Sequence, residues 1–290
     1  MKTKHLRLMQ RVYIVLFFCF MYLPIAYMIV FSFNQSKGYS LFTGFTLKWY
    51  SSLLHNSSIL HALLVSLEVA LISAVIATVL GTAASLGIAS MGRKSRLVVT
   101  NITYIPVVNP EIITGISLML LFVAYQRFAG RVEFLPDTIM GLPTLLIAHI
   151  MFCIPYVMLS VTPKLRSLDP NLIDAAMDLG ATPFQALTKV IVPQIKPGII
   201  SGALIAFTMS FDDFVISYFT TGNGVNNISI LVYTMSKRVN PSINALSTIV
   251  ILLITLVLGV VNIVPIMREK REKDGKSSRA VSRKAMAAVA

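Results

Sequence analysis

Four acidic residues stand inside long apolar stretches of this 290-residue chain: Glu68, Glu111, Asp212 and Asp213. No lysine or arginine lies inside the same stretches to neutralise them. A charged side chain at the centre of a membrane helix costs about 2.5–3.5 kcal/mol on insertion scales, so such residues usually serve a function. A path lined by carboxylates attracts cations and repels anions. These residues are therefore candidates for lining a path that carries a polycation.

Each acid also has a structural explanation. A carboxyl group that is protonated, or hydrogen-bonded to a neighbouring helix or subunit, stabilises an assembly without touching a solute. Asp212 and Asp213 are adjacent, so their side chains lie about 100° apart around a helix and cannot face one path equally. We expect one of them to line the path and the other to serve structure, and at this point either assignment is open.

Four tyrosines offer a second kind of cation ligand, because an ammonium group is attracted to the face of an aromatic ring. Tyr218 belongs to the candidate path, and Tyr104, Tyr125 and Tyr156 are further candidates. The alternative for each is an anchor at the membrane interface. His149, also in an apolar stretch, is expected to hydrogen-bond between helices rather than to act as a titrating switch.

The sequence predicts no catalysis by this chain alone. Gly275-Lys276-Ser277-Ser278 matches the end of a phosphate-binding loop, but the first glycine of that motif would fall at Lys270. No His-Glu-x-x-His metal motif is present, and the histidines have no nucleophile partner. We therefore expect neither catalytic nor metal-binding residues, and no cofactor in this chain.

Long apolar segments must position these groups. Hydrophobic residues make up 56% of the chain and charged residues 13%, with a mean hydropathy of +0.77. Crossing a hydrocarbon core of about 30 Å takes roughly 20 apolar residues in a helix. We predict six transmembrane helices, over Val12–Phe33, Ala62–Ser90, Val98–Ala124, Gly141–Thr162, Gly198–Phe219 and Ala245–Met267. Small residues around Gly81 and Gly87 predict close helix packing in the second of them.

The remaining composition fits a membrane protein. The net charge of +13 does not indicate nucleic-acid binding, because the basic residues flank apolar segments instead of forming one patch. Cys19 and Cys153 lie in apolar stretches without disulfide or metal-ligand spacing. The basic N-terminus resembles a signal peptide, but Val12–Phe33 is too long and ends in Ser-Phe-Asn-Gln, so we interpret it as an uncleaved helix.

The distribution of lysine and arginine predicts the orientation. One set of alternating loops, with both termini, carries 19 of these residues, and the opposite set carries 6. By the positive-inside rule, both termini are cytoplasmic, which requires an even number of spans. The segment 268–290 is basic and lacks apolar periodicity, so we expect a disordered tail near anionic lipid.

The cytoplasmic loop between the fourth and fifth spans predicts a short helix. Asp169 is a good N-cap, Pro170 suits the first helical position, and Gly180 suits the residue after a helix end. A helix of about ten residues is unstable alone in water, so it needs a surface on which to dock. A second short segment, Pro183–Val190, leads into the fifth span.

This loop resembles the EAA loop of ABC-importer permeases. The family pattern is Glu-Ala-Ala, three residues, Gly, nine residues, then Ile-x-Leu-Pro. The matching residues here are Asp174-Ala175-Ala176, Gly180, Val190, Val192 and Pro193. Aspartate replaces glutamate and valine replaces isoleucine and leucine, so an exact salt bridge of the family does not carry over.

Further segments resemble the spermidine/putrescine permeases, and specifically their shorter, C-type subunit. They are Trp49-Tyr50, Asn109-Pro110-Glu111, the stretch 148–153, Ser210-Phe211-Asp212-Asp213 and the stretch 240–246. The resemblance implies an all-α integral membrane protein with the type I ABC-importer permease (MetI-like) fold, in the cytoplasmic (inner) membrane of a bacterium. It divides the chain into a cytoplasmic N-terminus (1–11), the first helix with an outer loop (12–60), a permease core (61–267) containing the coupling loop 163–197, and the tail.

The resemblance also implies the partners. These are a dimer of ATPase subunits, which bind ATP and Mg²⁺, a second homologous permease subunit, an extracytoplasmic polyamine-binding protein and membrane lipid, with no nucleic acid. Closure of the ATPases would move the helix at Asp174–Gly180 and switch the path between inward and outward access. Asp174, Ala175, Ala176, Gly180 and Pro193 are then the coupling residues.

Two alternatives remain open at this point. One is a permease for another solute, an iron complex or an oxyanion, although an anion path should contain intramembrane lysine or arginine. The other is a proton-coupled secondary transporter with Glu111 and Asp212 as relays, which the coupling loop and the absence of visible repeats disfavour.

Overall fold

The computed structural model describes residues 2–38, 41–130, 140–222, 225–236, 242–256 and 259. Within these ranges the regular structure is helical, and the β-type pairing is an isolated bridge between Asn34 and Phe45. Five of the described helices are long and apolar enough to cross a membrane: Met9–Phe31, Ser57–Ala89, Glu111–Ala129, Leu142–Arg166 and Pro183–Asp212. A further apolar helix is described over Ser242–Leu256. The all-α membrane fold is confirmed, while much of the predicted sixth span and the tail 268–290 lie outside the described residues.

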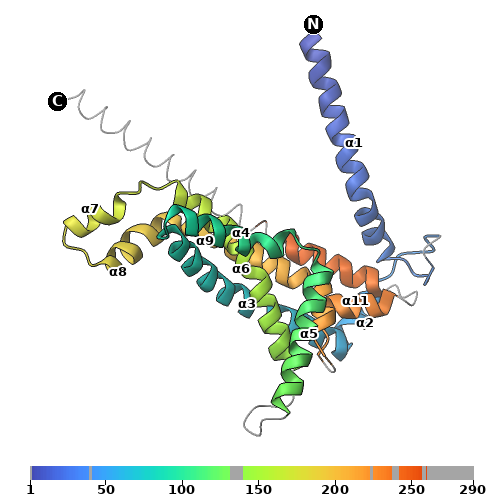
Figure 1. Cartoon of the computed structure of the whole chain (residues 1–290). Helices are drawn as coiled ribbons and strands as arrows, with labels where there is room; N and C mark the ends of the chain where they lie inside the picture. Colours follow the sequence, from blue (N-terminus) through green and yellow to red (C-terminus); the bar gives the residue numbers. More distant parts are fainter. Residues whose placement is uncertain are drawn as a thin grey trace, which may run out of the picture. The chain divides into compact units, whose positions relative to one another are not determined.

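The chain divides into two compact units. One unit is Ser57–Thr234, and the other combines Met1–Asn56 with Met235–Ala290. The helices of the first unit (Figure 1) are α3 (Ser57–Ala89), α4 (Arg93–Val108), α5 (Glu111–Ala129), α6 (Leu142–Arg166), α7 (Leu172–Asp178), α8 (Pro183–Gln185), the π-helical turn η1 (Ala186–Ile191), α9 (Val192–Asp212), α10 (Val215–Thr220) and α11 (Ile228–Ser236), which ends just beyond the unit's boundary.

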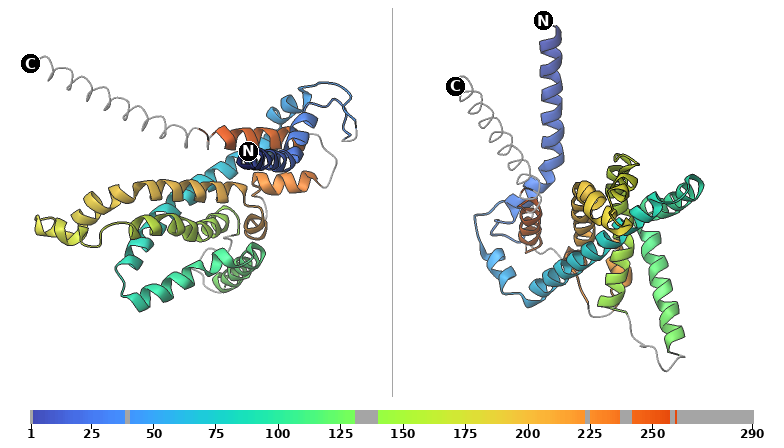
Figure 2. Two further views of the ribbon diagram at one scale, coloured as in Figure 1. Left: turned by 90° about the horizontal axis from the view of Figure 1, so that it is seen from above. Right: turned by 90° about the vertical axis from the view of Figure 1, so that its left-hand side faces the viewer.

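Close packing of three long helices forms the core of this unit. Val157 of α6 is fully buried. A Cβ atom added at Gly81 of α3 would lie 2.9 Å from the Val157 Cβ, and one added at Gly202 of α9 would lie 3.2 Å from its Cα. Glycine therefore lets α3 and α9 approach α6 closely, and Figure 2 shows α6 and α9 running side by side. The predicted packing role is confirmed for Gly81 but not for Gly87, where an added Cβ would meet open space.

Two predicted spans are interrupted. The third, expected to be continuous over Val98–Ala124, is α4 followed by α5, with a break at Asn109 and Pro110. The fifth, expected over Gly198–Phe219, is α9 followed by α10, with a break at Asp213. Both predictions of a continuous helix were wrong, and the breaks place Glu111, Asp212 and Asp213 at helix ends instead of helix interiors.

The first and last parts of the chain form the other unit, with α1 (Lys2–Phe31) and α2 (Lys48–Leu54). The buried side chain of Asn34 organises the connection between these helices. Its amide donates to the carbonyls of Gly38 and Leu41, and its Oδ1 accepts from the backbone N–H of Thr43. The indole of Trp49 donates a 2.7 Å hydrogen bond to the Asn34 carbonyl. The hydrogen bonds of this one asparagine thus hold together a loop that has little regular structure.

Candidate functional site

The two helix breaks lie against one another. Gly115, in the second turn of α5, packs on α10, because a Cβ atom there would lie 3.0 Å from the Phe219 ring and 3.5 Å from the Val215 carbonyl oxygen. α5 begins at Glu111 and α10 begins at Val215, so the first turns of both helices are neighbours. Chain breaks that meet inside an apolar assembly bring backbone polar groups and charged side chains to one place.

Proline chemistry explains the first break. Pro110 has no N–H to donate to the preceding turn, and a residue before proline is disfavoured in the α region. Asn109 accordingly has an extended backbone, with φ −74° and ψ 138°. Glu111 therefore begins α5, where it is exposed, and does not lie in the interior of one helix over Val98–Ala124 as predicted.

A buried carboxylate explains the second break. The Asp213 side chain accepts hydrogen bonds from the backbone N–H groups of Ile216 (3.3 Å) and Ser217 (2.7 Å) and from the Ser217 hydroxyl (2.9 Å). These groups form the first turn of α10, whose N–H groups have no helical acceptor of their own. The carboxylate thus ends one helix and caps the next.

His149 of α6 completes this buried network. Its Nδ1 lies 2.7 Å from the Ser210 hydroxyl on α9, and its Nε2 lies 2.9 Å from the Ser217 hydroxyl and 3.5 Å from the Asp213 carboxylate. The side chains of His149 and Asp213 are 1% and 2% exposed. The predicted interhelical hydrogen bonding of His149 is confirmed, and it joins α6 to both sides of the break.

Asn227 extends the network to α11 and was not predicted from the sequence. Its amide donates to the Ser217 hydroxyl (2.7 Å) and the Asp213 carbonyl (3.4 Å), and its Oδ1 accepts from the Ile230 backbone N–H. The backbone N–H of Ile228, the residue after Asn227, donates to the Ser66 hydroxyl on α3. The sequence did contain a signal for this role, because an asparagine directly before an apolar run is typical of a helix cap.

The predicted path residues occupy different environments. Asp213 is buried, whereas the side chain of Asp212 is exposed. Glu111 is close enough to Asp213 and to Tyr156 to interact with them electrostatically. Glu68 is exposed on α3, and no hydrogen bond or ion pair of the described residues joins it to this cluster. The structure therefore brings together three of the four acids.

Three of the four predicted tyrosines, Tyr104, Tyr156 and Tyr218, lie near the breaks, and Tyr125 does not. Tyr218 on α10 is 50% exposed. Tyr104 lines an open surface depression of about 550 Å³ along α4, together with Asn101, Ile105, Val108 and Asn109, and so lies beside the first break. Tyr156 packs its ring at 5.2 Å from that of Phe152. Tyr125 is half-buried near the far end of α5, well away from Glu111 along the helix.

A second candidate site is the loop between α6 and α9. α7 ends with Gly180 at φ +86°, where its N–H donates to the Met177 carbonyl and that of Ala181 donates to the Ala176 carbonyl. This pair of bonds is a Schellman motif, so the predicted role of Gly180 as the residue after a helix end is confirmed.

The start of α7 differs from the prediction. The helix begins at Leu172 rather than Pro170, and Asp169 is not its N-cap. The Asp169 side chain accepts instead from the Asn171 backbone N–H, at 2.9 Å, which closes a turn before the helix. α7 has seven residues, fewer than the ten expected.

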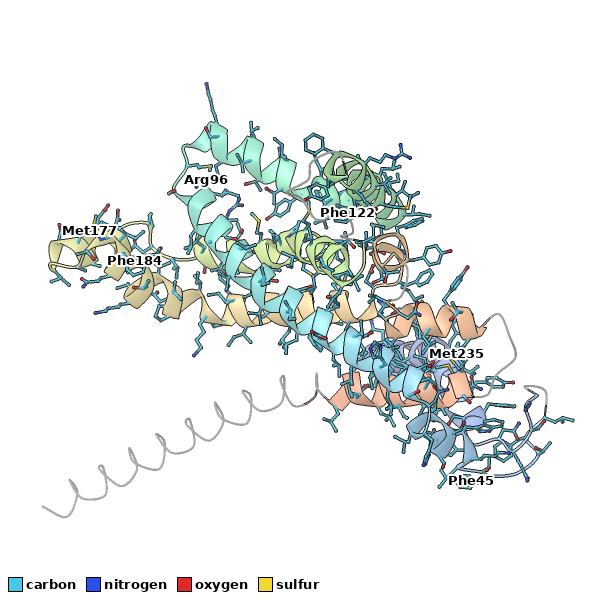
Figure 3. All side chains as sticks on the ribbon, turned by 90° about the horizontal axis from the view of Figure 1, so that it is seen from below. Phe45, Arg96, Phe122, Met177, Phe184 and Met235 are labelled. Carbon is cyan, nitrogen blue, oxygen red and sulfur yellow. The ribbon has the colours of Figure 1, made fainter. Side chains whose placement is uncertain are left out.

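The loop presents apolar side chains to its surroundings. Leu179 is 90% exposed and Phe184 is 73% exposed. Figure 3 shows Met177 and Phe184 at the tip that α7 and α8 form. Of the predicted coupling residues, Ala176 is half-buried and the others are exposed, namely Asp174, Ala175, Gly180 and Pro193. An exposed apolar patch on a polar loop is typical of a binding surface for another protein.

The described residues contain no group of three or more histidine, cysteine or acidic side chains arranged to hold a metal ion. At the helix breaks, carboxylates, hydroxyls and aromatic rings can attract a cation and form hydrogen bonds.

Comparisons with known proteins agree on one family. Residues 77–265 match the family described as binding-protein-dependent transport system inner membrane component. The chain is 40% identical over 243 residues to the putrescine transport system permease protein PotI of Escherichia coli (strain K12), which covers 83% of this chain and 84% of that protein. It is 35% identical over 248 residues to the spermidine/putrescine transport system permease protein PotC of the same strain, covering 85% and 90%. A bacterial ABC transporter that imports alginate has a similar fold, with a TM-score of 0.69 at 17% identity over 88% of this chain and 92% of that one.

Proposed function

Because this chain belongs to the family of binding-protein-dependent transport system inner membrane components, we propose that it is the permease subunit of an ATP-driven importer for polyamines. The observation that carries the substrate class is the cluster of Glu111, Asp212 and Asp213 at two adjoining helix breaks. In the described apolar helices, lysine and arginine lie in the end turns or, as Lys189 and Lys196 do, in the half of Pro183–Asp212 remote from Asp212. The relatives named for putrescine and spermidine transport support the same class.

In this proposal the acidic residues have different roles. Asp213 holds the break between α9 and α10, while Asp212 and Glu111 face the solute and offset its charge. Tyr218 adds an aromatic face. Glu68 is a path residue in this proposal only through a partner subunit, because within this chain it lies apart from the other three acids.

Energy for transport comes from partner subunits. α7 and the exposed side chains Leu179 and Phe184 dock on an ATPase dimer, whose subunits bind ATP and Mg²⁺. Movement of the ATPases shifts Asp174, Ala175, Ala176 and Gly180, and Pro193 at the start of α9 transmits the shift to the membrane helices. In this role the chain has no catalytic residues of its own.

The complex further contains a second permease subunit and an extracytoplasmic polyamine-binding protein. It lies in the inner membrane of a bacterium. The basic loops face the cytoplasm with both termini, as the lysine and arginine distribution predicts. The coupling loop then faces the ATPases, and Asp212 lies toward the opposite end of α9.

Uptake of radiolabelled spermidine and putrescine tests the proposal in cells that lack this chain. Wild type should restore uptake, and the Ala175→Trp variant should not, although both reach the membrane equally because Ala175 is exposed. Labelled ferric citrate and sulfate serve as comparison solutes. Restoration of either solute instead of polyamine uptake would show that the substrate class is wrong.

A further inference from the structure

The loop between α1 and α2 presents large apolar side chains that the described part of this chain leaves uncovered. Leu41 is 74% exposed and Phe45 is 69% exposed, and both Phe42 and Leu47 are exposed as well. Figure 3 shows the labelled side chain of Phe45 at the edge of this loop. Clustered apolar side chains that stay exposed indicate a surface that something else covers.

Hydrogen bonds inside the loop fix these side chains in exposed positions. The Gln35 backbone N–H donates to the Gly44 carbonyl at 2.9 Å, and the Thr46 backbone N–H donates to the Phe33 carbonyl at 2.8 Å. The Asn34 side chain satisfies further backbone groups between these two pairs. The exposure of the apolar side chains is therefore a property of a folded loop.

Ring contacts place the loop at the level of the last turn of α1. The ring centroid of Phe42 is 6.4 Å from that of Phe31, and the ring of Phe45 stacks on that of Phe33 at 5.2 Å. The apolar part of α1, Met9–Phe31, has 23 residues, which extend for about 35 Å in a helix. Because a hydrocarbon core is about 30 Å thick, the last turn of α1 reaches the boundary between hydrocarbon and headgroups. The exposed rings of the loop lie close to that boundary.

The charges of this part of the chain suit a phospholipid surface. Lys37 and Lys48 stand on either side of the exposed apolar residues, and the first acidic residue of the chain is Glu68. Lysine is attracted to anionic lipid, and aromatic rings are enriched at the level of the headgroups. The cationic and the aromatic side chains of the loop therefore fit the same surface.

We propose that Leu41, Phe42, Phe45 and Leu47 insert into the phospholipid interface beside the end of α1 and anchor this helix at a fixed depth. Interfacial anchors set the depth and tilt of a membrane helix. α1 depends on such an anchor because the described part of the chain buries no residue of its apolar stretch. The inference goes beyond the proposed function, since it requires a bilayer around α1 but not a polyamine substrate.

Photocrosslinking tests what covers the loop. The photoreactive residue p-benzoylphenylalanine is placed at position 42 or position 45 of the complete transporter. The transporter is reconstituted in nanodiscs of phosphatidylethanolamine and phosphatidylglycerol, with the binding protein in excess. After illumination, mass spectrometry of the peptides distinguishes attached phospholipid from attached protein. Phospholipid adducts should be the main crosslinked product at both positions.

Two other exposed leucines serve as matched controls for the same residue replacement. Leu16, within the apolar stretch of α1, should give phospholipid adducts, and Leu179, at the end of α7, should give none. Crosslinks from positions 42 and 45 chiefly to the binding protein or to the second permease would overturn the anchor. A phospholipid yield no higher than that at Leu179 would overturn it too. Polyamine uptake by the wild type tests the proposed function separately, so a failure of one is distinguishable from a failure of the other.

Discussion

Replacement of Gly180 by alanine should uncouple ATP hydrolysis from transport. Gly180 has φ +86°, and its N–H and that of Ala181 satisfy two carbonyls at the end of α7. A Cβ atom added at Gly180 would meet no atom of the described chain within 4 Å. The substitution therefore acts through the backbone conformation and not through a steric clash.

The size of the effect follows from the left-handed conformation. An L-residue with a Cβ pays about 1–2 kcal/mol in this region, which changes the population of the native helix end by roughly 5- to 30-fold. α7 has seven residues and little stability of its own. Most of that cost should therefore appear as loss of the docked geometry, and little as unfolding of the membrane helices.

The assay is the ratio of solute uptake to ATP hydrolysis by the complete transporter in proteoliposomes. In the Gly180→Ala variant this ratio should fall about 5- to 30-fold while membrane abundance is retained. Gly180→Asn should lose much less, because asparagine tolerates the left-handed region. Gly87→Ala is the matched control, since that helical glycine also has open space around its Cβ position. A wild-type ratio in Gly180→Ala would show that the geometry at this helix end does not transmit the signal.

Three further outcomes can be checked with the same material. Asp213→Asn should lower the thermal stability of the purified transporter by about 1–3 kcal/mol, because the amide replaces a charged acceptor of two backbone N–H groups, whereas Asp212→Asn should leave the melting temperature unchanged. Gly202→Val should abolish folded protein in the membrane, since its Cβ would lie 3.2 Å from the α6 backbone, and detergent-extracted monodisperse protein is the measurement. Ala175→Trp should keep normal membrane abundance but stop stimulation of ATP hydrolysis by the loaded binding protein, and normal stimulation would remove this residue from the docking surface.

The long helices could be predicted because their signal is local. An uninterrupted apolar stretch of sufficient length specifies a membrane helix wherever it occurs. The expected spans overlap α1, α3 and α6 closely, and the expected end of the coupling helix at Gly180 is where the structure has it. Each of these features depends on residues within a few turns of one another.

The helix breaks depend on partners that are distant in the chain. Pro110 was a visible signal for the first break, but membrane helices often continue through proline, as α6 does through Pro155. The second break contains no proline or glycine. It exists because Asp213 finds the Ser217 hydroxyl and His149, and because Asn227 returns from the next helix. No periodicity within Gly198–Phe219 encodes these contacts.

The position of the break changes how the acidic pair must be tested. If both aspartates lay on one continuous helix, neutralising them together would measure the path. Asp213 is instead the cap of α10 and is joined to α3, α6 and α11 through hydrogen-bonded side chains. Loss of uptake in the double variant would therefore follow from a collapsed break as readily as from a missing charge. The single change Asp212→Asn removes the exposed carboxylate and leaves the frame intact, so a loss of uptake at unchanged stability assigns the charge to the path.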